Sequence, residues 1–327
     1  MTATAPARPT QIAPTAAQGY ALATSDLRKS YGKRVALDGL DLAVPAGVVY
    51  GFLGPNGAGK TTTMRLLTGL IRPNTGSIEL LGQPFTWRDR RRLFNVGSLV
   101  ETPAFYPYMS GRDNLRVLAA AGPKVPRNRV EEVLDVVELR SRARDRFSTY
   151  SLGMKQRLGI AGALLNDPVL LLLDEPANGL DPAGIVAMRA LLRTLTGAGK
   201  TVFVSSHILP EVQQLADVVG IIARGRLVRE GRLDALLRES GHVRLRLGPD
   251  DATRAMELLQ QFTDGTPLKA PEPRPDGLLI RVPVDPHRSA EVNRLLAQNG
   301  IFVSALESES DLEEIFLGLT ESTGMGS

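Results

Sequence analysis

The residues best suited to chemistry lie at 54–62, where the sequence reads Gly-Pro-Asn-Gly-Ala-Gly-Lys-Thr-Thr. An apolar stretch, 48–53, precedes them and a helix-compatible run, 64–70, follows. A glycine-rich turn between a buried strand and a helix lets successive backbone N–H groups converge on phosphate oxygens. In this pattern the lysine reaches the β- and γ-phosphates and the hydroxyl after it coordinates Mg²⁺. The segment predicts a nucleotide site made by Gly54, Pro55, Asn56, Gly57, Ala58, Gly59, Lys60, Thr61 and Thr62.

Two adjacent carboxylates, Asp174 and Glu175, directly follow the apolar run 169–173. At the carboxyl end of a central parallel strand they would lie beside the phosphate loop. An aspartate there holds Mg²⁺, and the glutamate polarises an attacking water as general base. Without a phosphate loop upstream, an acidic helix start would explain the same pair equally well. With residues 54–62 present, we interpret Asp174 as a metal ligand and Glu175 as the catalytic base.

A second helix start suited to an anion lies at 151–157, Ser-Leu-Gly-Met-Lys-Gln-Arg. A Ser-x-Gly turn at a helix N-terminus exposes N–H groups and a hydroxyl to a phosphate. One ATP does not obviously need both this segment and the loop at 54–62 from one chain. A head-to-tail dimer would resolve the excess, because each ATP would lie between the phosphate loop of one copy and the Ser151 segment of the other.

The elements that must position these residues alternate between short apolar strands and helices. Continuous apolar runs such as 169–173 are typical of parallel strands buried on both faces. The alternation predicts an α/β domain with a mainly parallel core sheet and a helical part at about 101–166. Strands are predicted at 22–28, 40–44, 48–53, 96–100, 169–173, 201–204 and 218–223, and helices at 64–70, 110–121, 129–139, 152–165, 183–195 and 210–215.

The end of the chain has a different pattern. Residues 241–327 hold 8 Lys/Arg against 14 Asp/Glu, whereas the remainder holds 31 against 21. The order of elements is β-α-β-β-α-β with a closing helix, which predicts a small α+β ferredoxin-like module. Its strands are predicted at 242–247, 267–270, 278–282 and 301–306, and its helices at 251–262, 288–298 and 311–319.

Length and composition limit the remaining possibilities. The 327 residues suffice for one large domain and a smaller one, and the absence of cysteine excludes disulfides and thiol catalysis. No apolar run approaches the ~20 residues that cross a bilayer. We expect a disordered tail at 1–20, which does not resemble a signal peptide, a main domain at 21–239 and an accessory domain at 240–327.

Between residues 22 and 231 these motifs, in this order, resemble the ATP-binding subunit of an ABC transporter. The resemblance implies an ABC-type P-loop fold with an antiparallel β subdomain, and ATP and Mg²⁺ as cofactors. The signature motif of the family corresponds to Ser151 and Gly153, which would contact the phosphate in trans. The resemblance also implies an adenine-stacking aromatic, a D-loop aspartate and a switch histidine that contacts the γ-phosphate, here Tyr31, Asp181 and His207.

Two segments depart from the family pattern. The signature lacks its first Gly and its final Gln, although Ser151 and Gly153 are kept. The loop that usually carries Gln reads Val-Glu-Thr-Pro at 100–103, so Glu101 takes that place. A glutamate still ligates Mg²⁺, but it adds negative charge beside the γ-phosphate. Both departures resemble the bacitracin-resistance and lantibiotic-immunity type of antibiotic exporter.

The resemblance thus implies a homodimeric ATPase at the cytoplasmic face of the cell membrane. It would power export of a drug, antibiotic or lipid-like substrate through a separate membrane permease. The helical region 101–146 is the expected permease contact. Basic runs at 140–146 and around Trp87 either contact the permease or anionic lipid headgroups, or are solvated surface.

Two other functions are compatible with parts of the sequence. The basic main domain would suit an ABC-type ATPase that acts on nucleic acid or ribosomes. One ATPase domain and the lack of sustained heptads argue against it, so we do not expect a nucleic-acid partner. The second is a regulatory or drug-sequestering subunit, which drug binding by residues 240–327 alone would favour.

Overall fold

The structure is a computed structural model that describes residues 19–86, 88, 90–101, 103–239, 241–263, 267–275, 277–309, 312, 313, 315 and 316. Apart from its last two residues, the predicted tail at 1–20 lies outside the described residues, as does Trp87. The chain divides into two compact units, Met1–Arg232 and Leu233–Ser327. Each unit is described by itself.

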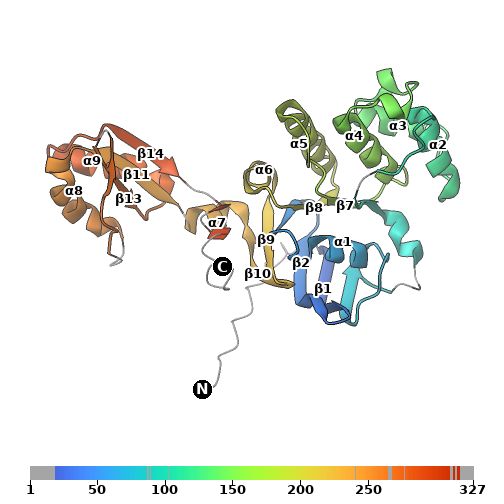
Figure 1. Ribbon diagram of the computed structural model, residues 1–327, viewed down its shortest axis with the longest axis horizontal. Helices are drawn as coiled ribbons and strands as arrows, with labels where there is room; N and C mark the ends of the chain where they lie inside the picture. Colours follow the sequence, from blue (N-terminus) through green and yellow to red (C-terminus); the bar gives the residue numbers. More distant parts are fainter. Residues whose placement is uncertain are drawn as a thin grey trace. The chain divides into compact units, whose positions relative to one another are not determined.

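The centre of the first unit is a six-stranded sheet with the order β10-β9-β3-β8-β7-β6 (Figure 1). All neighbouring strands are parallel except β9 and β10, which pair antiparallel. The mainly parallel core sheet expected from the sequence is therefore confirmed. The strands are β3 (Val49–Leu53), β6 (Val96–Leu99), β7 (Leu170–Asp174), β8 (Thr201–Ser206), β9 (Val218–Ala223) and β10 (Arg226–Arg232).

An antiparallel sheet with the order β2-β1-β4-β5 lies on one side of the core sheet. Helix α1 (Lys60–Leu67) packs between the two sheets, where Met64 and Leu67 share one buried cluster with Leu40 of β2 and Phe52 of β3. The strands are β1 (Tyr20–Tyr31), β2 (Arg34–Pro45), β4 (Thr75–Leu80) and β5 (Gln83–Phe85). β4 was not predicted because only two of its six side chains are buried, which leaves no regular apolar pattern.

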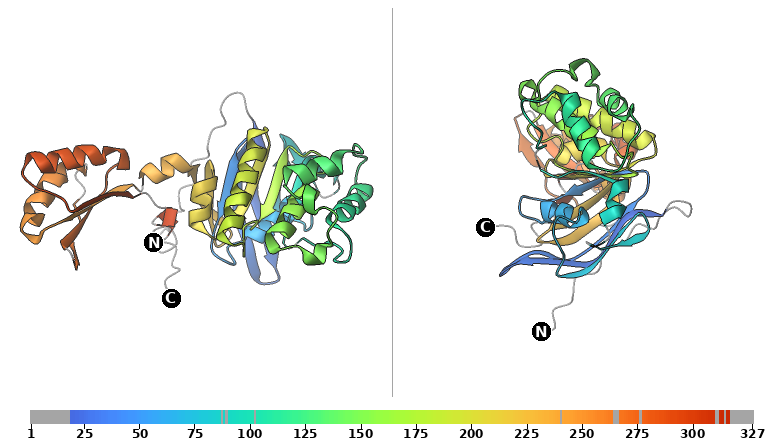
Figure 2. Two further views of the ribbon diagram at one scale, coloured as in Figure 1. Left: turned by 90° about the horizontal axis from the view of Figure 1, so that it is seen from above. Right: turned by 90° about the vertical axis from the view of Figure 1, so that its right-hand side faces the viewer.

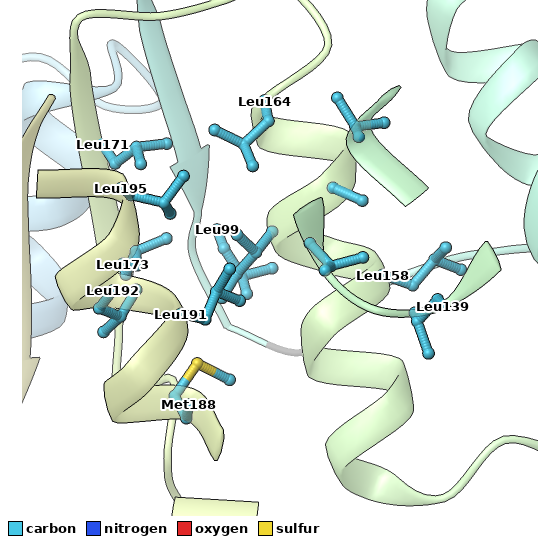
Figure 3. Close-up of a cluster of buried hydrophobic side chains, with 14 of the residues drawn as sticks. Leu99, Leu139, Leu158, Leu164, Leu171, Leu173, Met188, Leu191, Leu192 and Leu195 are labelled. Atoms are coloured by element: carbon cyan, nitrogen blue, oxygen red, sulfur yellow. The ribbon is translucent and has the colours of Figure 1, made fainter. Parts of the chain in front are cut away.

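Helices cover the other side of the core sheet (Figure 2). Along β7, Leu170 and Leu172 face the layer of α1, whereas Leu171 and Leu173 join the helical cluster. Figure 3 shows how this cluster interleaves side chains of α5 and β7 with Leu158 and Leu164. The helices are α2 (Gly111–Ala121), α3 (Arg129–Val136), α4 (Leu152–Ala163), α5 (Pro182–Gly197) and α6 (Leu209–Leu215), with 3₁₀ turns at η1 (Arg90–Asn95), η2 (Arg140–Arg142) and η3 (Phe147–Thr149).

The second unit contains a four-stranded antiparallel sheet with the order β12-β13-β11-β14. Its helices α8 and α9 pack on one face of this sheet, where Ala255 and Leu296 meet Leu245 and Ile280 in a buried cluster. The elements are α7 (Leu233–Glu239), β11 (His242–Leu247), η4 (Pro249–Asp251), α8 (Ala252–Leu259), η5 (Gln260–Phe262), β12 (Glu272–Arg274), β13 (Gly277–Val282), η6 (Pro286–Arg288), α9 (Ser289–Gln298) and β14 (Ala305–Glu309).

Two predicted strands of this unit are wrong in position. The segment 267–270 forms no strand, and β12 begins at Glu272 instead. β12 lies at the edge of the sheet, where a strand tolerates Pro273, which has no N–H to donate. The strand expected at 301–306 begins only at Ala305, because the Ile301 N–H closes the end of α9 on the Leu296 carbonyl. Most of the closing helix expected at 311–319 lies outside the described residues.

Within the described ranges, no helix has both the length and the apolar character needed to cross a membrane.

Candidate nucleotide-binding site

The loop at 54–62 joins β3 to α1, as its flanking sequence predicts. Gly59, the residue before α1, has φ of 117°, and a Cβ there would lie 2.8 Å from the carbonyl oxygen of Ala36. Only glycine fits such a backbone at such a close approach. No side chain caps the first N–H groups of α1, so these donors are available to an anion.

Lys60 is held beneath the loop. Its side chain is 5% exposed, and Nζ donates a hydrogen bond of 2.7 Å to the carbonyl oxygen of Gly54. The ammonium group therefore stands in a fixed position next to the N-terminus of α1.

A pocket of about 340 Å³ opens over this loop. It brings together the predicted residues Tyr31, Lys60 and Glu175, which come from three distant parts of the sequence. Two arginines that the sequence reasoning missed, Arg34 and Arg65, also line it. The remaining lining residues are Ala36, Asn56, Gly57, Gly59, Thr61 and Thr62.

The two glutamates predicted to act on the γ-phosphate side follow neighbouring strands. Leu99 of β6 pairs with Leu173 of β7, and Glu101 and Glu175 each come two residues later. Both have left-handed backbones, with φ of 66° and 46°. This conformation is uncommon for residues with a side chain and costs on the order of 1–3 kcal/mol, so the surrounding contacts must hold it. For Glu175 its N–H donates to both the carbonyl and the hydroxyl oxygen of Ser205.

The carboxylate of Glu175 lies between two cationic or donor groups. Oε1 is 3.5 Å from Nζ of Lys60, and Oε2 is 2.9 Å from Nδ1 of His207. The two predicted catalytic residues, Glu175 and His207, are therefore in contact. Glu175 also lies close to Lys60 of the phosphate loop. Nearby on α6, burial raises the pKa of Glu211, and the proximity of His207 partly offsets that effect.

The predicted metal ligands Thr61 and Asp174 supply hard oxygen donors, which fit Mg²⁺. Asp174 is 8% exposed and accepts a hydrogen bond of 2.5 Å from Ser205 Oγ, which fixes its orientation. Among the described residues, no group of three His, Cys, Asp or Glu could enclose a metal ion. Proteins commonly hold Mg²⁺ through one or two side chains together with phosphates and water.

Glu101, the third predicted Mg²⁺ ligand, does not point into the pocket. It is absent from the lining of the pocket, and its carboxylate is paired with the guanidinium of Arg65. The hydrogen bond to Glu101 is the main cause that raises the pKa of Arg65. Arg65 follows Thr61 by four residues on α1, so both lie on one helix face. This spacing is the sequence signal that could have identified Arg65 as a residue of the pocket.

The predicted trans residues lie in a separate pocket of about 460 Å³. Ser151 is the N-cap of α4 and accepts a hydrogen bond from the Met154 N–H, while Asp181 caps α5 through the Gly184 N–H. The Ser151 hydroxyl keeps its own proton as a donor. Ser151, Gly153 and Asp181 line this pocket, which shares no residue with the pocket over Lys60.

Comparisons with known proteins identify the family. Residues 37–178 match the ABC transporter family. The chain is 43% identical over 298 residues to the bacitracin transport ATP-binding protein BcrA of Bacillus licheniformis, an alignment that covers 90% of this chain and 96% of BcrA. The chain belongs to the ABC transporter ATP-binding proteins. The ABC-type fold of the main domain, ATP binding and the ATPase activity expected from the sequence are thereby confirmed.

Two further relatives of this ABC transporter ATP-binding protein differ in coverage. The lantibiotic transport ATP-binding protein SrtF of Streptococcus pyogenes is 43% identical and aligns with 65% of this chain and 91% of SrtF. The solved structure of cbiO1 from Clostridium perfringens, part of an ABC transporter complex, is 27% identical with a TM-score of 0.62. It covers 68% of this chain and 92% of cbiO1. The BcrA alignment is longer than the first unit and must extend into the second.

Proposed function

We propose that this ATPase powers export of a peptide antibiotic through a separate membrane permease, from the cytoplasmic face of the membrane. The observation that carries the proposal is the 43% identity to a bacitracin transport ATP-binding protein over 90% of the chain. The similarity to a lantibiotic transport ATP-binding protein supports the same class of substrate. Both named substrates are peptide antibiotics, so we assign the class rather than one compound.

The working form in this proposal is a homodimer. The pocket over Lys60 and the pocket at Ser151 share no residue, and both present helix N-termini suited to phosphate. In a head-to-tail dimer each ATP would contact Lys60 of one copy and both Ser151 and Gly153 of the other. Asp181, which lines the same pocket as Ser151, would lie at this interface.

The residues around the pocket divide the chemistry between them. Tyr31 stacks on adenine, Lys60 binds the β- and γ-phosphates, and Glu175 orients the attacking water. His207 contacts the γ-phosphate and holds the Glu175 carboxylate in place. Thr61 and Asp174 would hold Mg²⁺, which when bound would neutralise part of the phosphate charge.

The permease contact is proposed at 101–146. Tyr106 and Tyr108 are 50% and 70% exposed there, with ring centroids 5.9 Å apart. The buried side chain of Asn114 fixes this loop, because it accepts from the Tyr106 N–H and donates to the carbonyl oxygens of Tyr106 and Ser110. Rigid exposed aromatic side chains are typical anchors of protein interfaces.

Two arginines of the basic run are engaged within the chain, which favours a solvated surface for that part of the run. Arg140 pairs with Asp135, and Arg142 with Asp145.

Antibiotic susceptibility tests the proposal. Deletion of the gene should increase the susceptibility of the cell to bacitracin or to a lantibiotic, measured as the minimal inhibitory concentration. The wild-type gene should restore resistance and a Lys60→Ala variant should not. Arg193→Ala, a change on α5 that breaks an ion pair with Asp217 at the surface, serves as a control that restores it. Unchanged susceptibility of the deletion strain to peptide antibiotics of both kinds would sink the substrate class.

A further inference from the structure

The pair formed by Arg65 and Glu101 lies at the edge of the nucleotide pocket. Arg65 lines the pocket, and its Nη2 donates to Oε1 of Glu101. Both side chains are accessible, with 41% and 55% of their surface exposed. Glu101 itself is not a lining residue. The ion pair therefore keeps a carboxylate near the phosphate site but outside the pocket.

The surroundings of the pocket make an additional free carboxylate unfavourable. Asp174 and Glu175 already place two acidic side chains at the carboxyl end of β7, and Lys60 and His207 both lie close to Glu175. A nucleotide brings several negative charges, and like charges a few ångströms apart repel even when water screens them partly.

We propose that Arg65 is the positioning residue for Glu101: it holds the carboxylate at the rim and balances its charge, so that a glutamate in this loop does not repel the incoming nucleotide. This inference rests on the proposed placement of the phosphates beside Lys60. It concerns a residue to which neither the sequence motifs nor the proposed function gives a role.

The position of Arg65 supports this role in two ways. It lies on the helix face of Thr61, four residues away, and therefore on the side of α1 that the proposed metal site uses. Its pKa is raised chiefly by the hydrogen bond to Glu101 and, to a smaller extent, by Tyr31, the proposed adenine-stacking residue. Arg65 thus lines the pocket together with Tyr31 and is paired with Glu101 at its edge.

Nucleotide binding by four variants tests the proposal. The dissociation constant of MgATP is measured by isothermal titration calorimetry for wild type, Arg65→Ala, Glu101→Gln and the double variant. Arg65→Ala should weaken binding by about 5- to 10-fold, because the released carboxylate repels the phosphates. In the Glu101→Gln background the same change should have less than a twofold effect. Arg65→Lys, which keeps the charge, should bind within about twofold of wild type.

Three further measurements make the outcome decisive. Added salt should reduce the defect of Arg65→Ala, since an accessible charge is screened. Arg193→Ala, which breaks another exposed ion pair, should bind normally. If Arg65→Ala weakens MgATP binding equally in the wild-type and Glu101→Gln backgrounds, Arg65 binds nucleotide directly or supports the fold. If it weakens binding in neither background, Arg65 has no role in nucleotide binding. Either result overturns the proposal. Normal binding by Lys60→Ala would instead show that the proposed phosphate placement is wrong.

Discussion

Nδ1 of His207 lies 2.9 Å from Oε2 of Glu175, while the other oxygen of that carboxylate lies 3.5 Å from Nζ of Lys60. One carboxylate thus joins the residue after β8 to the lysine of the phosphate loop. In the proposed mechanism Lys60 and His207 both contact the γ-phosphate. The groups assigned to the phosphate are therefore the same ones that orient the Glu175 carboxylate.

Glu175→Gln should retain ATP binding and lose hydrolysis by roughly 10²- to 10⁴-fold, because the amide cannot accept a proton from water. Phosphate release measures the rate, and size-exclusion chromatography with ATP should show an accumulated dimer. Asn178→Ala, on the segment that follows, is a suitable nearby control. Near-normal turnover by Glu175→Gln with the permease present would remove Glu175 from the catalytic role.

Gly153→Asp should fold and bind ATP at its own Lys60 pocket, yet fail to form the ATP-dependent dimer. The nearest atom to a Cβ at this position is Leu180 Cδ2 at 3.7 Å, an ordinary contact, so the side chain has room. Its carboxylate would face the phosphate of the partner copy and should weaken ATP-driven dimerisation more than tenfold, measured by analytical ultracentrifugation. Gly153→Ala should dimerise nearly normally. A normal dimer of Gly153→Asp would contradict the trans contact.

Asn114→Ala and Tyr108→Ala should have different effects, the first on the stability of the fold and the second on binding to the permease. Asn114 is 2% exposed and its amide satisfies several backbone groups, so its loss should destabilise the fold by about 1–3 kcal/mol. Tyr108 is 70% exposed, and its loss should change stability by less than about 0.5 kcal/mol. Tyr108→Ala should nevertheless reduce co-purification with the permease. If it co-purifies as wild type does, the proposed contact surface is misplaced.

Glu230 gives a prediction about pH. It is buried at 6% exposure and accepts a hydrogen bond from Tyr50, and burial raises its pKa above the ordinary value of 4.5. The unfolded chain therefore ionises this group first as pH rises, and the folded state loses stability from about pH 4.5 up to the raised pKa. Glu230→Gln removes this loss.

Urea unfolding at pH 4.5 and 7.5 measures the effect of Glu230. The stability of Glu230→Gln relative to wild type should be more favourable at the higher pH. Tyr50→Phe, which removes the donor, should make the pH dependence of the wild-type carboxylate steeper. Equal differences between Glu230→Gln and wild type at both pH values would show that Glu230 does not titrate in this range.

Local sequence patterns predicted the parts of the site that depend on local backbone geometry. The loop at 54–62 and the helix start at Ser151 need only short-range spacing, and the structure places each of them at the start of its helix. The parallel core strands could be predicted because both of their faces are buried, which makes their sequences continuously apolar. The Arg65–Glu101 pair was missed because it joins residues 36 positions apart, and a side-chain contact of that kind leaves no periodic signal.

The elements that the sequence misplaced have few buried side chains. β12 has no fully buried residue, and its position depends on pairing with β13. β4 and β5 likewise follow from pairing in the antiparallel sheet, since most of their side chains are exposed. In such strands the cross-strand hydrogen bonds decide the structure, and single-chain apolar patterns carry little information.

The two pockets that share no residue have a genetic consequence. If a working unit needs both composite sites, a chain that still dimerises but cannot hydrolyse ATP, such as Glu175→Gln, inactivates the normal copy with which it pairs. When both forms are made in equal amounts, pairs of two intact copies are the minority. A loss-of-function allele that folds and dimerises should therefore be dominant over the wild-type allele.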